Sequence, residues 1–458
     1  MHEIPQTYLD QQLAEGIGDL EVTLDRAGGH KVSPRLAPAP QARNGTPNAE
    51  YDNGRGYRPH GAVGMPNYGE RCVGNSSCIP ICPVQAKYTP LRTQAQCDPD
   101  LVAIATRRVV NRVLFRENGR ATGVEYQVYD DPRSTAASTH YVTGSVVVLA
   151  AHAIENAKLL LASDVRNQAV GRHLMDHPLV VTQALVPEEL SRNLGPHRGP
   201  AATSFIDQFR DGPWRESMAA FRVGVFNWGW GFKAESFSRE VRALADHGTL
   251  TPTNGSDGPN SPMIGRKMRQ ALVEHMPRQF QLEFMLEQTP KWTNRVTIDR
   301  AHRDRLGNFR PVISYGIDEY VRAGVRQAIE VSEQINAKLG AKEWNFTPRK
   351  RTEHRKGEET VIEILQAGNH GHHYEVLGAR HGAGTHLMGT EPTTSVVDEY
   401  QRCHQHQNLY AVGCGSMVTI GTSNPTLTGA MLALRSADQM HRDLMELNRP
   451  ANIAARVG

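Results

Sequence analysis

The sequence predicts a mixed α/β (α+β) fold, and three observations carry this prediction. Residues Val146 to Ala151 form an apolar run typical of a buried parallel strand, and a helix-like segment follows from Ile154 to Leu161. A second apolar run, Leu409 to Val412, leads into a loop rich in Gly, Ser and Thr and then into another helix-like segment. Between these regions, strand-like segments alternate with loops and precede one long amphipathic helix.

The composition places the chain among globular proteins. Its 458 residues suffice for two or three domains, or for one large α/β unit with an insertion. Hydrophobic residues make up 39% and charged residues 22%, and the net charge of +3 comes without a dense basic run, so no nucleic-acid partner is expected. No apolar stretch is long enough to span a bilayer. The first twenty residues lack the apolar core of a signal peptide, which favours a cytoplasmic location.

Residues 1–97 form an irregular, loop-rich segment with an unusual group of cysteines. Three of the six cysteines, Cys72, Cys78 and Cys82, lie within eleven residues, and Pro83 follows the last of them. The Cys-x-x-x-Cys-Pro ending is like that of the cluster loops of bacterial ferredoxins. Three thiolates suit a three-iron (3Fe–4S) cluster, so we predict that this loop holds one.

Other interpretations of the three cysteines stay open at this point. They can be buried or redox-idle thiols, or two of them can form a disulfide. A zinc site is a further alternative, although it needs a fourth ligand such as His60.

Residues 98–178 predict a small β-meander that is followed by a strand and a helix. Leu101 to Ala105 and Val109 to Phe115 are strand-like, Asn118-Gly119 is a hairpin turn, and Gly123 to Tyr129 returns. The apolar run and the helix described above complete this part of the chain.

Residues 179–375 predict a second domain that consists of an antiparallel sheet backed by helices. The strand-like segments are Leu179–Val186, Phe221–Phe226, Phe280–Leu286 and Arg295–Ile298. The helix is expected from Asp318 to Leu339, because four apolar side chains fall near one of its faces. These are Val321, Val325, Ile329 and Ile335.

The last part of the chain, residues 376–458, contains the motifs that carry chemistry. The stretch HGAGTHLMG begins at His381, SVVD ends at Asp398, and an Asn424-Pro425 pair follows the Gly-rich loop. A strand, a backbone-rich turn and a helix N-terminus in this order make a site for an anionic or highly oxygenated group. Gly413, Gly415 and Gly421 let the backbone approach a ligand closely, and Pro425 suits the first turn of the helix.

Taken together, these motifs resemble the C-terminal signature of the glucose–methanol–choline (GMC) flavoprotein oxidoreductases. The matching segments are His-Gly-x-Gly-Thr, Val-Val-Asp, Gly-Cys-Gly-Ser and Ser-Asn-Pro-Thr. Their details are closest to the sugar-dehydrogenase and pyranose-oxidase branches. The resemblance implies FAD as the cofactor, His381 as the catalytic base and Asn424 as its catalytic partner.

The resemblance also implies which residues contact FAD. Val110 and Ala150 match positions on the adenine side, although His152 stands where the family has a glycine. The backbone around four C-terminal residues would meet the ribityl and pyrophosphate groups. These are Cys414, Gly415, Pro425 and Thr426.

In domain terms, the resemblance implies that residues 98–178 and 376–458 are parts of one two-dinucleotide-type FAD domain, and that residues 179–375 bind the substrate. This FAD domain is expected to be incomplete, because we find no Gly-x-Gly-x-x-Gly after an apolar strand. GRHLMDHP, from Gly171 to Pro178, matches the family's link out of the FAD domain. We favour a packed link over a metal site at His173 and His177.

The cysteine loop resembles the cluster loop in catalytic subunits of FAD-dependent sugar dehydrogenases. This implies a cytochrome or quinone acceptor, a small subunit, and a periplasmic location reached through an exported partner. Our leading hypothesis is therefore a sugar or polyol dehydrogenase. The alternatives are a pyranose-type oxidase that uses oxygen, and an inert fragment or half of a split flavoenzyme whose N-terminal half lies on another chain.

Overall fold

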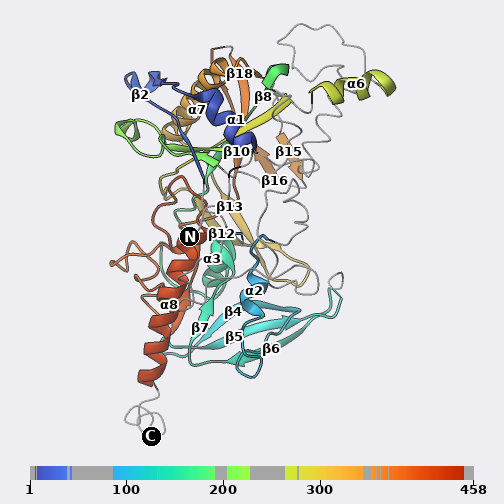
Figure 1. The fold of residues 1–458 in the computed structure, drawn as a ribbon. Helices are drawn as coiled ribbons and strands as arrows, with labels where there is room; N and C mark the ends of the chain where they lie inside the picture. The colour runs from blue at the N-terminus through green and yellow to red at the C-terminus, as the bar shows by residue number, and fades with distance from the viewer. Residues whose placement is uncertain are drawn as a thin grey trace, which may run out of the picture. The chain divides into compact units, whose positions relative to one another are not determined.

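The structure is a computed structural model, and it describes residues 6, 8–38, 42–43, 86–131, 133, 135–190, 204–226, 264–275, 278–343, 352–355, 358–361, 363–369 and 371–447 (Figure 1). The predicted cluster cysteines Cys72, Cys78 and Cys82, together with His60, lie outside these residues. The chain divides into two compact units, which are treated separately below. Unit 1 comprises Met1–Val102, Pro178–Leu286 and Glu319–Leu377, and unit 2 comprises Ala103–His177, Glu287–Asp318 and Gly378–Gly458.

Unit 1 is built on an antiparallel sheet, as the sequence predicts for residues 179–375. Its described part has eight strands, in the order β17-β18-β8-β11-β10-β9-β3 with β14 beside β8. Their bounds are β3 (Leu36–Pro38), β8 (Pro178–Leu185), β9 (Ser204–Ile206), β10 (Phe221–Phe226), β11 (Gln279–Leu286), β14 (Lys342–Glu343), β17 (Glu363–Ala367) and β18 (His372–Gly378). The smaller elements of unit 1 are α1 (Tyr8–Ile17), β1 (Val22–Leu24), η1 (Asp25–Ala27), β2 (His30–Val32), α2 (Pro90–Gln94), η2 (Pro213–Glu216), α6 (Gly265–His275), β15 (Thr352–Arg355) and β16 (Glu358–Val361).

Helix α7 (Glu319–Lys338) packs against this sheet and confirms the predicted amphipathic helix. The four predicted apolar residues are all buried: Val321, Val325, Ile329 and Ile335. Two of the three polar side chains on the buried face of α7 form the following hydrogen bonds. Ser332 is hydrogen-bonded to Thr182 at 2.7 Å, and the Gln327 side-chain oxygen accepts the backbone N–H of Arg26 at 3.0 Å.

Unit 2 contains the parallel strands. Strand β7 (Val147–Leu149) pairs with β19 (Leu409–Ala411) in parallel register, so that Val147 faces Leu409. Helix α3 (His152–Ala162) follows β7 and packs beside it in the core with Leu149, Leu160 and Leu409 buried. These elements confirm the predicted strand–helix segment, and Figure 1 shows α3 and β7 in the same part of the unit.

The meander of unit 2 is a three-stranded antiparallel sheet, in the order β4 (Arg108–Phe115), β5 (Ala121–Val128) and β6 (Ser138–Thr143). The predicted turn at Asn118-Gly119 joins β4 to β5, and Gly119 has a positive φ of 79°. The predicted strand at Leu101–Ala105 is wrong. The Asp98 side chain accepts the backbone N–H of Asp100 at 2.9 Å and thereby forms a turn, and the following Leu101 is 83% exposed.

Two strands that precede α7 in sequence belong to unit 2. Strands β12 (Arg295–Arg303) and β13 (Phe309–Ser314) form an antiparallel ribbon that packs against α3. They lie within the 179–375 range that we assign to the substrate domain. Which unit binds cofactor and which binds substrate stays a prediction.

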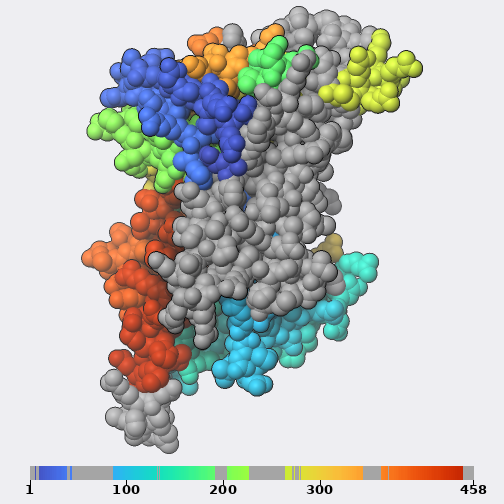
Figure 2. All heavy atoms as spheres, in the orientation of Figure 1, coloured from blue at the N-terminus to red at the C-terminus, as the bar shows by residue number. Residues whose placement is uncertain are grey.

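Helix α8 (Thr426–Leu447) is the last described element, and η5 (Cys414–Ser416) precedes it. The carbonyl of Pro425 accepts the N–H of Gly429 at 2.8 Å, so Pro425 opens the helix as predicted. One side of α8 is apolar and exposed, with Leu427, Met431 and Leu434 more than half exposed, and its residues lie at the surface in Figure 2. Among the described residues, no helix has the length and apolarity that a membrane span requires.

Candidate active site

Two motifs that are far apart in sequence run side by side in unit 2. The link GRHLMDHP lies antiparallel to the stretch that contains HGAGT, because Met175 and Ala383 exchange two backbone hydrogen bonds of 2.9 Å. This close approach requires a glycine at Gly384. Its φ is +85°, and a Cβ there would lie 2.1 Å from the backbone oxygen of His173. The pairing brings Asp176 and His177 next to His381.

The Asp176 carboxylate links the two paired segments by hydrogen bonds. Its Oδ1 accepts the backbone N–H groups of His177 and His381, both at 2.8 Å, and its Oδ2 accepts the N–H of Arg380 at 2.9 Å. Gln288 in turn accepts the N–H of Asp176 at 2.9 Å and the hydroxyl of Tyr315 at 3.0 Å. Hydrogen bonds to an ionised carboxylate are among the strong ones, so the backbone at His381 is firmly placed.

Three side chains then form a hydrogen-bonded row. The Nδ1 atoms of His177 and His381 lie 2.8 Å apart, with the two rings at 87° to each other. On its other side, His381 Nε2 lies 3.1 Å from the side-chain nitrogen of Asn424. His177 is fully buried, His381 is half-buried and Asn424 is exposed. The row therefore runs from the interior to the surface, and it brings the two predicted catalytic residues into contact.

Electrostatics favour neutral rings in this row. Burial lowers the pKa of His381 below its usual value, opposed by the Asp176 carboxylate and aided by the nearby His152. Burial lowers the pKa of His177 further, to about 3, and the neighbouring His381 contributes to that shift. Near pH 7 the His381 ring is therefore neutral, which is the state in which an imidazole can accept a proton.

The same residues include the ligand types of a metal site. Ligand atoms of Asp176, His177 and His381 all lie within 4.8 Å of one another. However, both Asp176 oxygens already accept backbone N–H groups, and the two Nδ1 atoms are at hydrogen-bonding distance from each other. We therefore describe this group as a hydrogen-bonded base and not as a metal centre.

The residues expected to bind cofactor begin at the carboxyl ends of the two parallel strands. Ala150 directly follows β7, and the turn Gly413–Ser416 follows β19. Buried Asn156 joins these strand ends, because its side chain accepts the N–H of Ala151 at 2.8 Å and donates to the carbonyls of Leu149 and Val412 at 3.1 and 3.0 Å. In open α/β sheets, ligands bind at this edge.

The turn after β19 offers an open backbone surface. A Cβ at Gly413 or at Gly421 would meet no atom within 4 Å, whereas a Cβ at Gly415 would lie 2.0 Å from the His386 ring. The His386 ring therefore packs against the turn at Gly415, and the backbone is open at Gly413 and Gly421. Together with the N-terminus of α8, the turn fits the ribityl and pyrophosphate part of a flavin dinucleotide, because such groups accept hydrogen bonds from backbone N–H groups.

The individual cofactor-contact predictions stay predictions. Ala150 and Thr426 are exposed, Pro425 is buried, and Cys414 is half-buried with its thiol 3.9 Å from the Pro425 carbonyl. Val110 belongs to a different sheet, where it pairs with Tyr126 in the β4–β5 hairpin. Its side chain packs against the hydrophobic core that includes residues of α3.

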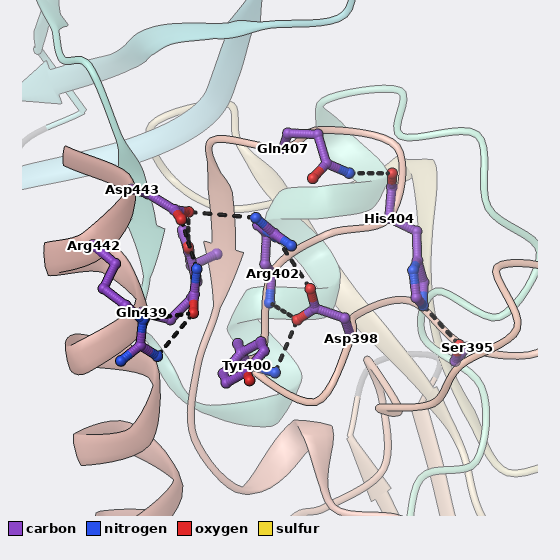
Figure 3. A network of polar contacts seen from close by, with 10 residues as sticks. Ser395, Asp398, Tyr400, Arg402, His404, Gln407, Gln439, Arg442 and Asp443 are labelled. Atoms are coloured by element: carbon purple, nitrogen blue, oxygen red, sulfur yellow. Dashed lines mark hydrogen bonds and ion pairs between the residues drawn. The ribbon is translucent and has the colours of Figure 1, made fainter. Parts of the chain in front are cut away.

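A polar network holds α8 to the strand that carries the turn (Figure 3). Asp398, the end of the SVVD motif, binds the Arg402 guanidinium at 3.1 Å. Arg402 also contacts Asp443 of α8 at 3.4 Å, and the Tyr410 hydroxyl of β19 donates to Asp443 at 2.5 Å. The motif thus has a structural role that the sequence pattern alone does not reveal.

Sequence reasoning missed Asp176 and His177 as site residues. The sequence predicts only a packed link here, with a metal at His173 and His177 as the lesser alternative. His173 instead packs edge-on against Trp292, with ring centroids 5.4 Å apart. Only the neighbouring Asp-His pair beside an apolar strand signalled that something polar is buried there.

Comparisons with known proteins agree with the motifs. The family described as GMC oxidoreductase matches at residues 68–179 with its N-terminal part and at residues 290–433 with its C-terminal part, together more than half of the chain. Among solved structures, pyridoxine 4-oxidase from Mesorbium loti has a similar fold, with a TM-score of 0.52, 18% identity, and coverage of 96% of this chain and 71% of that chain.

Among curated proteins, the fructose dehydrogenase large subunit of Gluconobacter japonicus is 28% identical, over 89% of this chain and 63% of that protein. The 2-methyl-1,2-propanediol dehydrogenase of Mycolicibacterium austroafricanum is 26% identical, over 73% of this chain and 53% of that protein. Paromamine 6'-oxidase of Streptomyces fradiae is 26% identical, over 67% of this chain and 47% of that protein. The chain thus spans about half to two thirds of the length of these relatives.

Proposed function

Because this chain belongs to the GMC oxidoreductase family, we propose that it is an FAD-dependent oxidoreductase that oxidises a CH–OH group of a sugar or polyol. The observation that carries the proposal is the 3.1 Å contact between His381 Nε2 and the Asn424 side chain. It places an acceptor and a donor side by side where the row of side chains reaches the surface. A substrate hydroxyl can then give its proton to His381 while it accepts a hydrogen bond from Asn424.

The two residues have different tasks in this proposal. His381 is the general base, because its lowered pKa keeps the imidazole neutral near pH 7. Asn424 cannot exchange a proton, so it orients the hydroxyl, and such positioning supplies several kcal/mol of barrier lowering. Since the Asp176 carboxylate holds the backbone of His381, the base is preorganised before substrate arrives.

FAD supplies the hydride acceptor when it is bound. The turn at Gly413–Ser416 and the first turn of α8 would hold its ribityl and pyrophosphate groups, and Ala150 and Val110 would lie on its adenine side.

The substrate class rests on the relatives. Their names are those of dehydrogenases and an oxidase of hydroxyl-bearing compounds, among them fructose and 2-methyl-1,2-propanediol. The fructose dehydrogenase relative is a large subunit, which supports a small subunit and an electron acceptor as partners of this chain. In this proposal Cys72, Cys78 and Cys82 would hold a 3Fe–4S cluster, which would supply electron transfer to a cytochrome or quinone acceptor.

An oxidase is the second candidate, and the names of paromamine 6'-oxidase and pyridoxine 4-oxidase favour keeping it. Replacing Cys78 with Ser separates the two. A dehydrogenase of the proposed type loses iron and electron transfer to an added acceptor while the substrate still reduces the flavin. An oxidase keeps its oxygen consumption.

The proposed function is tested first by spectroscopy and by His381→Ala. We expect the purified chain to show two resolved flavin bands and a broad iron–sulfur shoulder, with flavin and iron assayed on the same sample. The His381→Ala variant should lose nearly all turnover of the best sugar or polyol and keep its flavin. His302→Ala, at a partly exposed histidine, is the matched control and should keep turnover. Activity of His381→Ala within a few-fold of the parent would overturn the assignment of the base.

A further inference from the structure

We propose that His177 is a positioning residue that accepts the Nδ1–H of His381 and so leaves the Nε2 lone pair of His381 facing Asn424 and the substrate hydroxyl. The inference rests on the proposed function, since it concerns the same base. It adds a residue to the site for which sequence alone suggests only a link or a metal ligand.

The contact between the two rings allows only two proton arrangements while both rings are neutral. At 2.8 Å between the Nδ1 atoms, one nitrogen donates and the other accepts. If His381 donates, its Nε2 carries a lone pair. If His177 donates, His381 carries its proton on Nε2 and cannot accept one there. The direction of this one hydrogen bond therefore decides whether His381 is a base at its exposed nitrogen.

The surroundings of His177 favour the first arrangement. With Nδ1 engaged by His381, its other nitrogen, Nε2, is buried, and among the described residues it has no partner of full hydrogen-bond geometry. Backbone hydrogen bonding at Ile420 and Gly421 opposes the lowering of the His177 pKa, so these residues favour an N–H on this ring. Because Nδ1 is engaged by His381, that N–H is assigned to Nε2 of His177, which makes Nδ1 the acceptor.

The surroundings of His381 point the same way. The side-chain nitrogen of Asn424 lies 3.1 Å from His381 Nε2, and an amide nitrogen can only donate. Until a substrate hydroxyl takes that place, a lone pair on His381 Nε2 accepts that hydrogen bond. The assignments of donors and acceptors thus agree along the row, from His177 through His381 to Asn424.

The arrangement also suits the charged state that forms after proton transfer. When His381 has accepted a proton on Nε2, its Nδ1–H continues to donate to His177. Because His177 is fully buried and remains neutral, it adds no repulsion to the imidazolium. A neutral histidine here performs the orienting task that a buried carboxylate performs in a Ser-His-Asp triad.

The tautomer of His381 can be measured on the purified chain without turnover. Ring ¹⁵N chemical shifts in a protein labelled at histidine distinguish a bare nitrogen from an N–H, and a His381→Asn variant identifies the signals. We expect wild-type His381 to carry its proton on Nδ1 near pH 7. A proton on Nε2 would overturn the proposal, whatever the substrate of the enzyme.

Variants at residue 177 supply the second test. His177→Leu removes the acceptor, so we expect a mixture of His381 tautomers and a kcat roughly 100-fold lower with KM changed less than about threefold. His177→Asn places an amide oxygen near the position of Nδ1, and it should restore the Nδ1–H tautomer and kcat to within about tenfold of wild type.

His173→Asn is the matched control, because His173 belongs to the same segment but packs against Trp292. It should keep the tautomer and kcat of wild type. Equal losses of kcat in His173→Asn and His177→Leu would mean that the segment has only a structural role, which contradicts the proposal. An unchanged His381 tautomer in His177→Leu would also contradict it. Should His177→Leu not fold, the wild-type and His177→Asn spectra still decide. A chain that oxidises no sugar or polyol contradicts the proposed function and leaves the tautomer measurement valid.

Discussion

The backbone N–H of His381 donates a 2.8 Å hydrogen bond to Oδ1 of Asp176, across 205 positions of sequence. The same carboxylate accepts the N–H groups of His177 and Arg380. One side chain therefore fixes the backbones of both histidines relative to each other. The geometry of the candidate base depends on a residue that takes no direct part in proton transfer.

We expect Asp176→Asn to lower the free energy of unfolding by about 1–3 kcal/mol, because an amide nitrogen then faces a backbone N–H that has lost its acceptor. The pKa of His381 should also fall, since the Asp176 charge raises it. Urea unfolding and histidine NMR measure the two effects. Asp131→Asn, at an exposed aspartate of the same unit, is the control and should change stability by less than about 0.5 kcal/mol. Equal stability of both variants would contradict the role of Asp176.

The stability of the fold should fall as the solution becomes acidic, because two buried histidines are neutral in the folded state. Burial lowers the pKa of His177 and of His386 to about 3, from 6.5 in the unfolded chain. Between these values the unfolded chain binds protons that the folded chain does not. The stability present above pH 6.5 is therefore lost toward pH 3, by about 1.4 kcal/mol per pH unit for each histidine.

Chemical unfolding at a series of pH values from 7 to 4.5 checks this dependence. Carboxylates titrate in the same range, so the informative quantity is the difference between wild type and His177→Asn. The variant should lose the share of the slope that His177 contributes. Parallel curves for the two proteins would show that the pKa of His177 is the same in the folded and unfolded chain.

We expect Tyr410→Phe to lower the free energy of unfolding by about 1.5–3 kcal/mol, because the hydroxyl donates to the charged Asp443 of α8. Tyr400→Phe is the matched control in the same network (Figure 3), since the Tyr400 contact drawn there is made by its backbone N–H. It should change stability by less than about 0.5 kcal/mol. Denaturant midpoints of the two variants give the comparison, and a Tyr410→Phe midpoint equal to that of wild type would refute the prediction.

His152 has a φ of +73°, a conformation that costs a non-glycine residue about 1–2 kcal/mol. His152→Gly should therefore raise stability by roughly 0.5–1 kcal/mol, after the greater freedom of glycine in the unfolded chain is subtracted. It should also raise the pKa of His381, because His152 lowers it. Asp164→Gly, at another position of positive φ, should leave the pKa of His381 unchanged. A His152→Gly variant less stable than wild type would contradict the strain argument.

Local sequence patterns predict the helices and strands whose own apolar residues form the buried face. Helix α7 shows the apolar periodicity of its buried face, and β7 and β19 are short apolar runs. The segment Leu101–Ala105 failed because its apolar residues face solvent, and a strand pattern cannot tell whether a partner strand exists. The turn that Asp98 forms with Asp100 was the competing signal.

The site was predictable where a motif carries it and unpredictable where tertiary pairing does. His381 and Asn424 stand in recognisable motifs, and the structure brings them into contact. Asp176 and His177 lie beside His381 only because Met175 pairs with Ala383, a contact between segments about 200 residues apart. No periodicity within the link contains that information.

This long-range pairing has a consequence for the order in which the protein is made. His177 leaves the ribosome 204 residues before His381, and Asn424 follows 43 residues later. At about 5–20 residues per second, the first histidine waits roughly 10–40 s for its partner. During that interval the ring that is later fully buried lacks its partner and is accessible to water. The base and its preferred tautomer therefore arise late in biosynthesis, when the C-terminal motifs close over the link.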